Sequence, residues 1–190
     1  MICSPRLLNI TGLSLLALIF LCACAFAGGL RVVWTDSLPR GLYWVHPGAT
    51  RRGSIVSACL PPIIARFGME RGYISSGQCP GGSGGVAKMV AAVAGDTVRI
   101  NTHGVFINKY LWPWSTSTAT DWSGRPLGAR SGVFRIRSGE VLLMGLNPHS
   151  WDARYFGPVP QRFITGLATP LLIENGAATA IIRNNTIPRS

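Results

Sequence analysis

The sequence predicts a mainly β domain that follows one N-terminal hydrophobic helix. Residues 7–30 carry no charged side chain, and a helix of this length can cross a hydrocarbon core. Beyond them, short runs rich in Val, Ile and aromatic residues alternate with turns that contain Gly and Pro, which is typical of strands. The chain shows almost no alternation of strands with helices, so a parallel sheet with crossover helices is not expected.

The composition narrows the class of protein further. A chain of 190 residues with 47% hydrophobic and 13% charged residues is neither disordered nor a multi-pass membrane protein. The formal net charge is +11, and only Lys88 and Lys109 among the 18 basic residues are lysines. Scattered arginine would attract anionic lipid headgroups or acidic partners. Nucleic acid is not an expected partner, because the longest arginine cluster is Arg51-Arg52 and no recognition-helix or zinc-finger pattern occurs.

The N-terminal segment defines the expected organisation of the chain. Residues 1–27 are either a membrane anchor or a signal segment, since "AFA" before Gly28 also fits a cleavage site. Both alternatives export the rest of the chain. We expect residues 28–175 to form the exported domain, and residues 176–190, which are small and polar without a clear packing face, to form a tail.

The exported part reads as strands separated by loops. A helix is expected over residues 63–74, where apolar residues are loosely helix-spaced, a glycine-rich loop over 75–85 and an exposed Trp-rich loop over 112–128. Gly95-Asp96 and residues 102–104 look like hairpin turns. Strands are expected in RVVWTDS (31–37), GLYWV (41–45), GSIVSACLP (53–61), VAKMVAAVAGDTVRI (86–100), GVFINKYL (104–111), EVLLMGLN (140–147) and ITGLATPLLI (164–173).

Two cysteines lie in the exported part, Cys59 and Cys79. In an oxidising compartment they most simply form one disulfide, which would add about 3 kcal/mol by closing the loop between them. No metal site and no cofactor is expected, because the cysteines lack close spacing and the three histidines have no ligand-like periodicity.

Three residues are candidates for chemistry, and each has a plainer interpretation. Ser83 completes a formal Gly-x-Ser-x-Gly pattern, but without a preceding strand and a following helix we interpret it as loop. Lys88 lies in the apolar segment "GVAKMVAAVAG", either buried, where its pKa would fall and it could act as a base, or on an edge strand with its amine in water. Ser37, in "DSLP", is on its own chemistry a turn serine.

Three segments in order resemble signal peptidase I, and within it the TraF-type maturation proteases of conjugative plasmid transfer. "DSLPRGLYW" is similar to the serine segment just beyond the membrane, "AKMVAAVAGDTVRI" to the lysine strand, and "HSWDARYFG" to the third motif. Two departures are visible: Met89 replaces an arginine common in bacterial signal peptidases, and "GLNPHS" lacks their acidic residues. The resemblance extends from the N-terminal segment to about residue 173.

The resemblance implies a Ser-Lys peptidase on a signal-peptidase-like β domain of hairpins and a partly open barrel. It implies Ser37 as nucleophile and Lys88 as general base, with Asp152 also needed for activity. Ser150 would orient the lysine, Arg154 would brace Asp152, and Thr35 would assist the Ser37 backbone N–H at the oxyanion.

The same resemblance implies a substrate and a location. The expected substrate is a conjugative pilin precursor or another preprotein at the periplasmic side of the inner membrane, with mating-pair formation proteins as further partners. Capture of the acyl-enzyme by water would cleave the precursor, and capture by its own N-terminal amine would cyclise it. Exposed tryptophans in the loop, including Trp112 and Trp114, suggest bilayer contact.

Three alternatives stay open from the sequence. A general type I signal peptidase would share the dyad and accept many exported preproteins. A Ser-His-Asp hydrolase would use His149 with Asp152. A non-catalytic periplasmic component of a conjugation or secretion apparatus would need none of these residues for chemistry.

Overall fold

The structure, a computed structural model that describes residues 5–184, is mainly β, as the sequence predicts. Every strand pair is antiparallel, and the strands form two sheets. The larger sheet has the order β1 (Leu30–Val33), β2 (Gly41–His46), β11 (Ile164–Ile173), β3 (Ile55–Ala58), β4 (Val86–Val93), β9 (Glu140–Met144) and β10 (Val159–Pro160). The smaller sheet has the order β7 (Tyr110–Leu111), β6 (Gly104–Ile107), β5 (Thr97–Asn101) and β8 (Gly132–Arg135).

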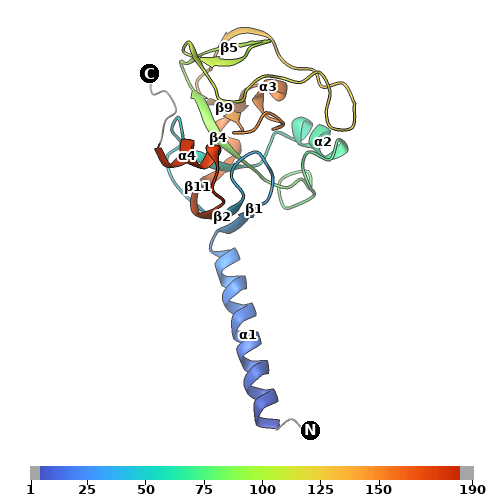
Figure 1. Ribbon diagram of the computed structural model, residues 1–190, viewed down its shortest axis with the longest axis vertical. Helices are drawn as coiled ribbons and strands as arrows, with labels where there is room; N and C mark the ends of the chain where they lie inside the picture. The colour runs from blue at the N-terminus through green and yellow to red at the C-terminus, as the bar shows by residue number, and fades with distance from the viewer. Residues whose placement is uncertain (1–4, 185–190) are drawn as a thin grey trace.

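Helices cover little of the domain. Helix α1 (Pro5–Ala27) projects away from the sheets, and the smaller sheet lies at the end of the domain far from it (Figure 1). Judged by length and hydropathy, none of the helices within residues 5–184 qualifies as a membrane span. The choice between anchor and signal segment for residues 1–27 stays a prediction. The other helical segments are α2 (Pro62–Glu70), α3 (Ala153–Phe156), the 3₁₀ turn Gln161–Phe163 and α4 (Ala177–Asn184).

The centre of the larger sheet is its most buried part. Strand β4 pairs with β3 on one side and β9 on the other, and both β4 and β9 consist largely of buried apolar residues. Strand β11, the last in the chain, pairs with β2 and with β3. It therefore joins the N-terminal hairpin of β1 and β2 to the rest of the sheet.

The predicted hairpin at Gly95-Asp96 is wrong, because β4 and β5 belong to different sheets. The turn carries the chain from the larger sheet to the smaller one. Asp96 fixes it: the carboxylate accepts the Val93 N–H at 2.8 Å and forms an ion pair with Arg52 from the β2–β3 connection. The hairpin predicted at residues 102–104 is confirmed by the pairing of β5 with β6.

Two further predictions need correction. The end of the chain is not a tail without a packing face, since Ala178, Ile181 and Ile182 of α4 pack against the core; residues 185–190 lie outside the described part. In the Trp-rich loop, Trp112 is only 2% exposed, because its ring packs into the core and its N–H finds a buried carbonyl. The loop lies away from α1 (Figure 1), so its placement gives no support to the predicted bilayer contact.

The helix expected over residues 63–74 is α2, which is shorter than predicted. It begins at Pro62, where a proline fits because the first helical N–H needs no partner. It ends at Glu70, and Gly72 then turns the chain with a φ of 73°, a conformation that favours glycine.

Candidate active site

Ser37 lies in the turn between β1 and β2, at the edge of the larger sheet. Its carbonyl accepts a hydrogen bond from the Leu146 N–H at 2.7 Å, from the segment that follows β9. Two residues on, the Pro39 carbonyl accepts the buried Tyr43 hydroxyl at 2.8 Å. The backbone that carries the serine is therefore held from two sides, although the side chain itself is half-buried.

Lys88 lies on the central strand β4, opposite Val56 of β3. Its side chain is 4% exposed, so the interpretation of an edge lysine with its amine in water is wrong. Burial lowers the pKa of Lys88 from 10.5 to about 8; the Asp152 carboxylate opposes this shift, and the Arg154 guanidinium adds to it. The pKa therefore lies about one unit above neutral pH, so a minor but usable fraction of the amine is neutral there.

The structure brings three predicted residues together at one point. Lys88 Nζ donates to Ser37 Oγ at 2.5 Å and to Ser150 Oγ at 2.7 Å, and the two hydroxyl oxygens lie 3.1 Å apart. The three side chains come from the β1–β2 turn, from β4 and from the loop before α3. A hydroxyl within hydrogen-bond reach of a desolvated amine is the arrangement that serine activation needs.

Beneath this cluster, Asp152 and Arg154 form an ion pair in which both side chains are completely buried. The carboxylate accepts from Arg154 Nε at 2.8 Å and Nη2 at 2.9 Å, and from the Gly145 N–H at 2.9 Å. The guanidinium also donates to the Ser150 carbonyl at 2.7 Å. The remaining contacts of the guanidinium are with the carbonyls of Trp114, Thr116, Asn147 and Pro148.

This network gives Arg154 a clear local effect. Because one guanidinium binds the carbonyls of the loop 147–150, it fixes the backbone that carries Ser150. A planar group with five donors suits this task better than the single ammonium of a lysine. The predicted pairing of Asp152 with Arg154 is present in the structure.

A cleft of about 530 Å³ opens over the cluster. Residues 31–37 line one side, residues 84–88 the other, and the aromatic rings of Tyr73, Trp122 and Trp151 close one end. Strand β1 is the edge of the larger sheet, so its outer backbone groups are available to an extended peptide. Thr35 is exposed in the cleft near Ser37, and its assistance at an oxyanion stays a prediction.

The structure does not assemble the alternative triad. His149 lines the cleft, but the Asp152 carboxylate is occupied by Arg154 and Gly145. Ser83 is completely buried in the glycine-rich loop, which leads into β4 and not into a helix, so the loop interpretation is confirmed. Among residues 5–184, no group of three His, Cys, Asp or Glu side chains is placed to hold a metal ion.

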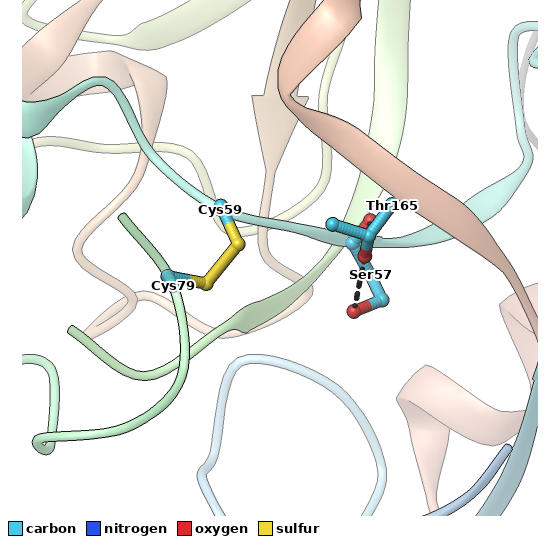
Figure 2. The surroundings of a disulfide bond; sticks show 4 residues. All are labelled: Ser57, Cys59, Cys79 and Thr165. Atoms are coloured by element: carbon cyan, nitrogen blue, oxygen red, sulfur yellow. Dashed lines mark hydrogen bonds between the residues drawn. A yellow bond between two sulfur atoms is a disulfide. The ribbon is translucent and has the colours of Figure 1, made fainter. Parts of the chain in front are cut away.

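The disulfide between Cys59 and Cys79 is present, with an S–S distance of 2.04 Å. It joins the end of β3 to the glycine-rich loop, as Figure 2 shows. Nearby, the Thr165 hydroxyl of β11 donates to Ser57 Oγ at 3.0 Å, and Ser57 lines the cleft. The disulfide therefore attaches the glycine-rich loop, which forms one side of the cleft, to the sheet that carries Lys88.

Sequence reasoning missed two residues of this site, Gly145 and Trp112. A Cβ on Gly145 would lie 2.2 Å from Ser150 Oγ, so only glycine allows the two to approach so closely. The sequence feature that could have identified Gly145 was its position at the end of an apolar strand and five residues before Ser150. For Trp112, the neighbouring polar residues and prolines hid a buried ring.

Comparisons with known proteins identify the family of the chain. The family model described as signal peptidase, peptidase S26, matches residues 7–172. Two plasmid transfer proteins TraF from Escherichia coli are 40% and 38% identical to the chain, each over 82% of it and over 90% and 89% of their own lengths. A probable conjugal transfer protein TraF from Sinorhizobium fredii is 35% identical over 88% of the chain and 89% of its own length.

Among solved structures, a signal peptidase I from Enterococcus faecalis aligns with 64% of this chain and 98% of its own, with a TM-score of 0.37 and 19% identity. The relatives span most of the chain, and the family match over residues 7–172 includes the segments of Ser37, Lys88 and Ser150. The chain therefore belongs to the signal peptidase family of serine peptidases, peptidase S26, and to its TraF-type members.

Proposed function

We propose that this protein is a serine endopeptidase with a Ser37–Lys88 dyad that matures a pilin precursor during plasmid conjugation. The observation that carries the proposal is the buried Lys88 amine, which lies 2.5 Å from Ser37 Oγ with its pKa lowered to about 8. At pH 7 roughly one amine in ten is neutral at that pKa, and the neutral form can accept the serine proton.

The reaction follows from this proton transfer. Ser37 Oγ attacks the scissile carbonyl while Lys88 takes the hydroxyl proton, and the Ser37 backbone N–H, with the Thr35 hydroxyl, stabilises the oxyanion. Protonated Lys88 then gives its proton to the leaving amine, which leaves an acyl group on Ser37. An incoming water or amine attacks this ester, and neutral Lys88 again accepts the proton.

The surrounding residues would hold the dyad in place. Ser150 accepts a hydrogen bond from Lys88 and so directs the amine toward Ser37. Asp152 and Arg154 support Ser150 from below through the Ser150 carbonyl. A completely buried ion pair is costly to leave half-made, so these two residues would act together.

The relatives provide the support for the substrate. Their names place them in plasmid and conjugal transfer, and TraF-type enzymes are the maturation proteases that the three segments resemble. A pilin precursor or another preprotein would enter the cleft as an extended strand beside β1. Capture of the acyl group by water gives cleavage, and capture by the amine of the pilin itself gives a cyclic product.

We place the domain at the periplasmic side of the inner membrane, where mating-pair formation proteins would be its neighbours. The disulfide supports this placement, because structural disulfides persist in oxidising compartments. The hydrophobic helix α1 at the start of the chain is compatible with export by either route.

The test compares wild type with Ser37→Ala and Lys88→Ala in cells that carry the plasmid. We expect both variants to accumulate unprocessed pilin precursor and to lose plasmid transfer, with Ser83→Ala as a matched control that processes normally. Mass spectrometry of the product would separate the linear from the cyclic form. Normal maturation in Ser37→Ala would contradict the proposed dyad.

A general signal peptidase is the second candidate, because the matching family model is named for that activity. The two differ in substrate range. If expression of this protein restores growth when the host signal peptidase is depleted, many preproteins are substrates. Processing of the pilin precursor without such rescue supports the dedicated enzyme.

A further inference from the structure

Trp112 connects the smaller sheet to the backbone beside the serine. It follows β7, its side chain is 2% exposed, and its indole Nε1 donates to the Gly145 carbonyl at 3.0 Å. Gly145 immediately follows β9 of the larger sheet. The hydrogen bond is buried, so the Gly145 carbonyl would have no water to replace the indole if the indole N–H were removed.

The Gly145 carbonyl, which accepts the indole N–H, belongs to the same peptide group that holds Ser37. In the Gly145–Leu146 peptide, the C=O accepts from Trp112 and the N–H donates to the Ser37 carbonyl at 2.7 Å. A peptide group is planar and rigid, so the position of one end determines the position of the other. Hydrogen bonds at both ends of one peptide group also strengthen each other by polarisation.

The same glycine contacts the third member of the cluster. The Gly145 N–H donates to Asp152 at 2.9 Å, and its α-carbon packs so closely on Ser150 that a Cβ would lie 2.2 Å from the hydroxyl oxygen. A displacement of Gly145 would therefore move the backbone of Ser37 and the side chain of Ser150 together. Lys88 donates to both hydroxyls, but its backbone belongs to β4 and would not move with Gly145.

Trp112 is itself well fixed. Its backbone N–H donates to the Val105 carbonyl of β6 at 2.8 Å, and its backbone carbonyl accepts the Ser115 hydroxyl at 2.7 Å. From these contacts we infer that Trp112 is a positioning residue: through the Gly145–Leu146 peptide it sets the backbone of Ser37, and it does not set the protonation of Lys88. The inference rests on the proposed Ser37–Lys88 peptidase.

Two variants separate the hydrogen bond from the bulk of the ring. Trp112→Phe removes the N–H and some volume, and replacement of Trp112 by 3-benzothienylalanine removes the N–H but keeps the ring shape. We expect kcat for the pilin precursor to fall about tenfold in both, because small misplacement of a nucleophile is costly. KM should stay within about twofold, and the acid limb of the kcat/KM–pH profile should keep its midpoint near pH 8.

The matched control is Trp44→Phe on β2, a partly exposed tryptophan whose neighbour Tyr43 faces the cleft, so that Trp44 points the other way. Its kcat should stay within about twofold of wild type. All assays use the full chain at a temperature where melting curves show each variant folded, so a loss of folded protein cannot lower kcat.

Three results would overturn the inference: an unchanged kcat in the benzothienyl variant, a loss seen in KM alone, or a shifted acid limb. The first would show that Trp112 acts by packing, the second that it acts on binding, and the third that it acts through Lys88. Processing that survives Ser37→Ala would contradict the proposed function and this inference with it. Normal Ser37-dependent processing combined with any of the three results contradicts this inference alone.

Discussion

The floor of the cleft and its loop wall are held in place by different interactions. The floor, which consists of Ser37, Lys88, Ser150, Asp152 and Arg154, is fixed by hydrogen bonds between buried groups. The loop wall, residues 71–85 and 121–125, is fixed by the disulfide and by ion pairs between the buried Asp121 carboxylate and two arginines that reach solvent. Buried polar bonds on every side give a single geometry, whereas one covalent link and ion pairs with partly solvated arginines hold a loop in place with less precision.

The ion pairs of the loop wall converge on one carboxylate. Asp121 accepts the Tyr73 hydroxyl at 2.6 Å and Arg125 Nε at 2.7 Å. Burial acts to raise the pKa of Asp121, but the hydrogen bonds from Tyr73 and Arg125 outweigh it and hold the pKa well below its ordinary value. The carboxylate therefore stays ionised in mildly acidic solution, and the wall keeps its ion pairs there.

The largest expected difference between floor and wall comes from neutralising one carboxylate in each. Asp152→Asn leaves the completely buried Arg154 without its counter-charge, and we expect a loss of about 3–5 kcal/mol in the free energy of unfolding. Asp121→Asn is the matched control, since its arginine partners reach solvent, and its loss should be clearly smaller. Urea unfolding of both variants checks the order, and equal losses would contradict the distinction between floor and wall.

Removal of the disulfide should lower the free energy of unfolding with little change in kcat. With Cys59→Ser and Cys79→Ser together, the 20-residue separation predicts a loss of about 3 kcal/mol in the free energy of unfolding. Because the wall does not contact the reacting atoms, kcat at a temperature where the variant is folded should change little, while KM rises. A kcat loss of about tenfold or more would show that the wall also positions the dyad.

Lys88→Met should give the smallest change in stability and a complete loss of activity. The pKa of Lys88 is about 8 in the folded chain and near 10.5 in the unfolded chain, so below pH 8 folding buries a charged amine at a cost of about 1–3 kcal/mol. The variant should be more stable than wild type by that amount at pH 7. Wild type should recover the difference as the pH rises from 8 to 10.5.

The comparison of the two unfolding curves at pH 7 and pH 10 isolates this effect, because other titrating groups are common to both proteins. The same pKa makes wild-type kcat/KM rise with pH, reach half of its maximum near pH 8 and level off above about pH 9. A variant less stable than wild type at pH 7 would contradict the cost assigned to the buried lysine. In Lys88→Met the hydroxyls of Ser37 and Ser150 would not lose all their partners, because they lie 3.1 Å apart and can form a hydrogen bond with each other.

The sequence predicted the parts of this protein that depend on local pattern. The alternation of apolar residues identified the strands, and the pairing of Cys59 with Cys79 followed from their being the two cysteines beyond the N-terminal hydrophobic segment. What local pattern could not show was partnership between distant segments. Gly95-Asp96 has hairpin chemistry, yet the strands on either side pair with other strands of two different sheets.

The same reason explains what was seen and missed at the site. For Lys88, the residues alone left burial and exposure open, because only the neighbours of β4 decide whether its strand is central. The roles of Ser37 and Ser150 came from resemblance, and the structure adds their distances to Lys88. Trp112 was misjudged because its partner, the Gly145 carbonyl, is supplied by a segment 33 residues away.

The position of β11 has a consequence for when this enzyme can act. Ser37 lies in the hairpin of β1 and β2 and Lys88 lies on β4, and β11 (Ile164–Ile173) lies between β2 and β3 and joins the two parts. A nascent chain that has not yet delivered residue 173 cannot complete this sheet. If Ser37 and Lys88 act as the proposed nucleophile and base, their assembly requires nearly the whole polypeptide, and a chain that still lacks β11 should be inactive.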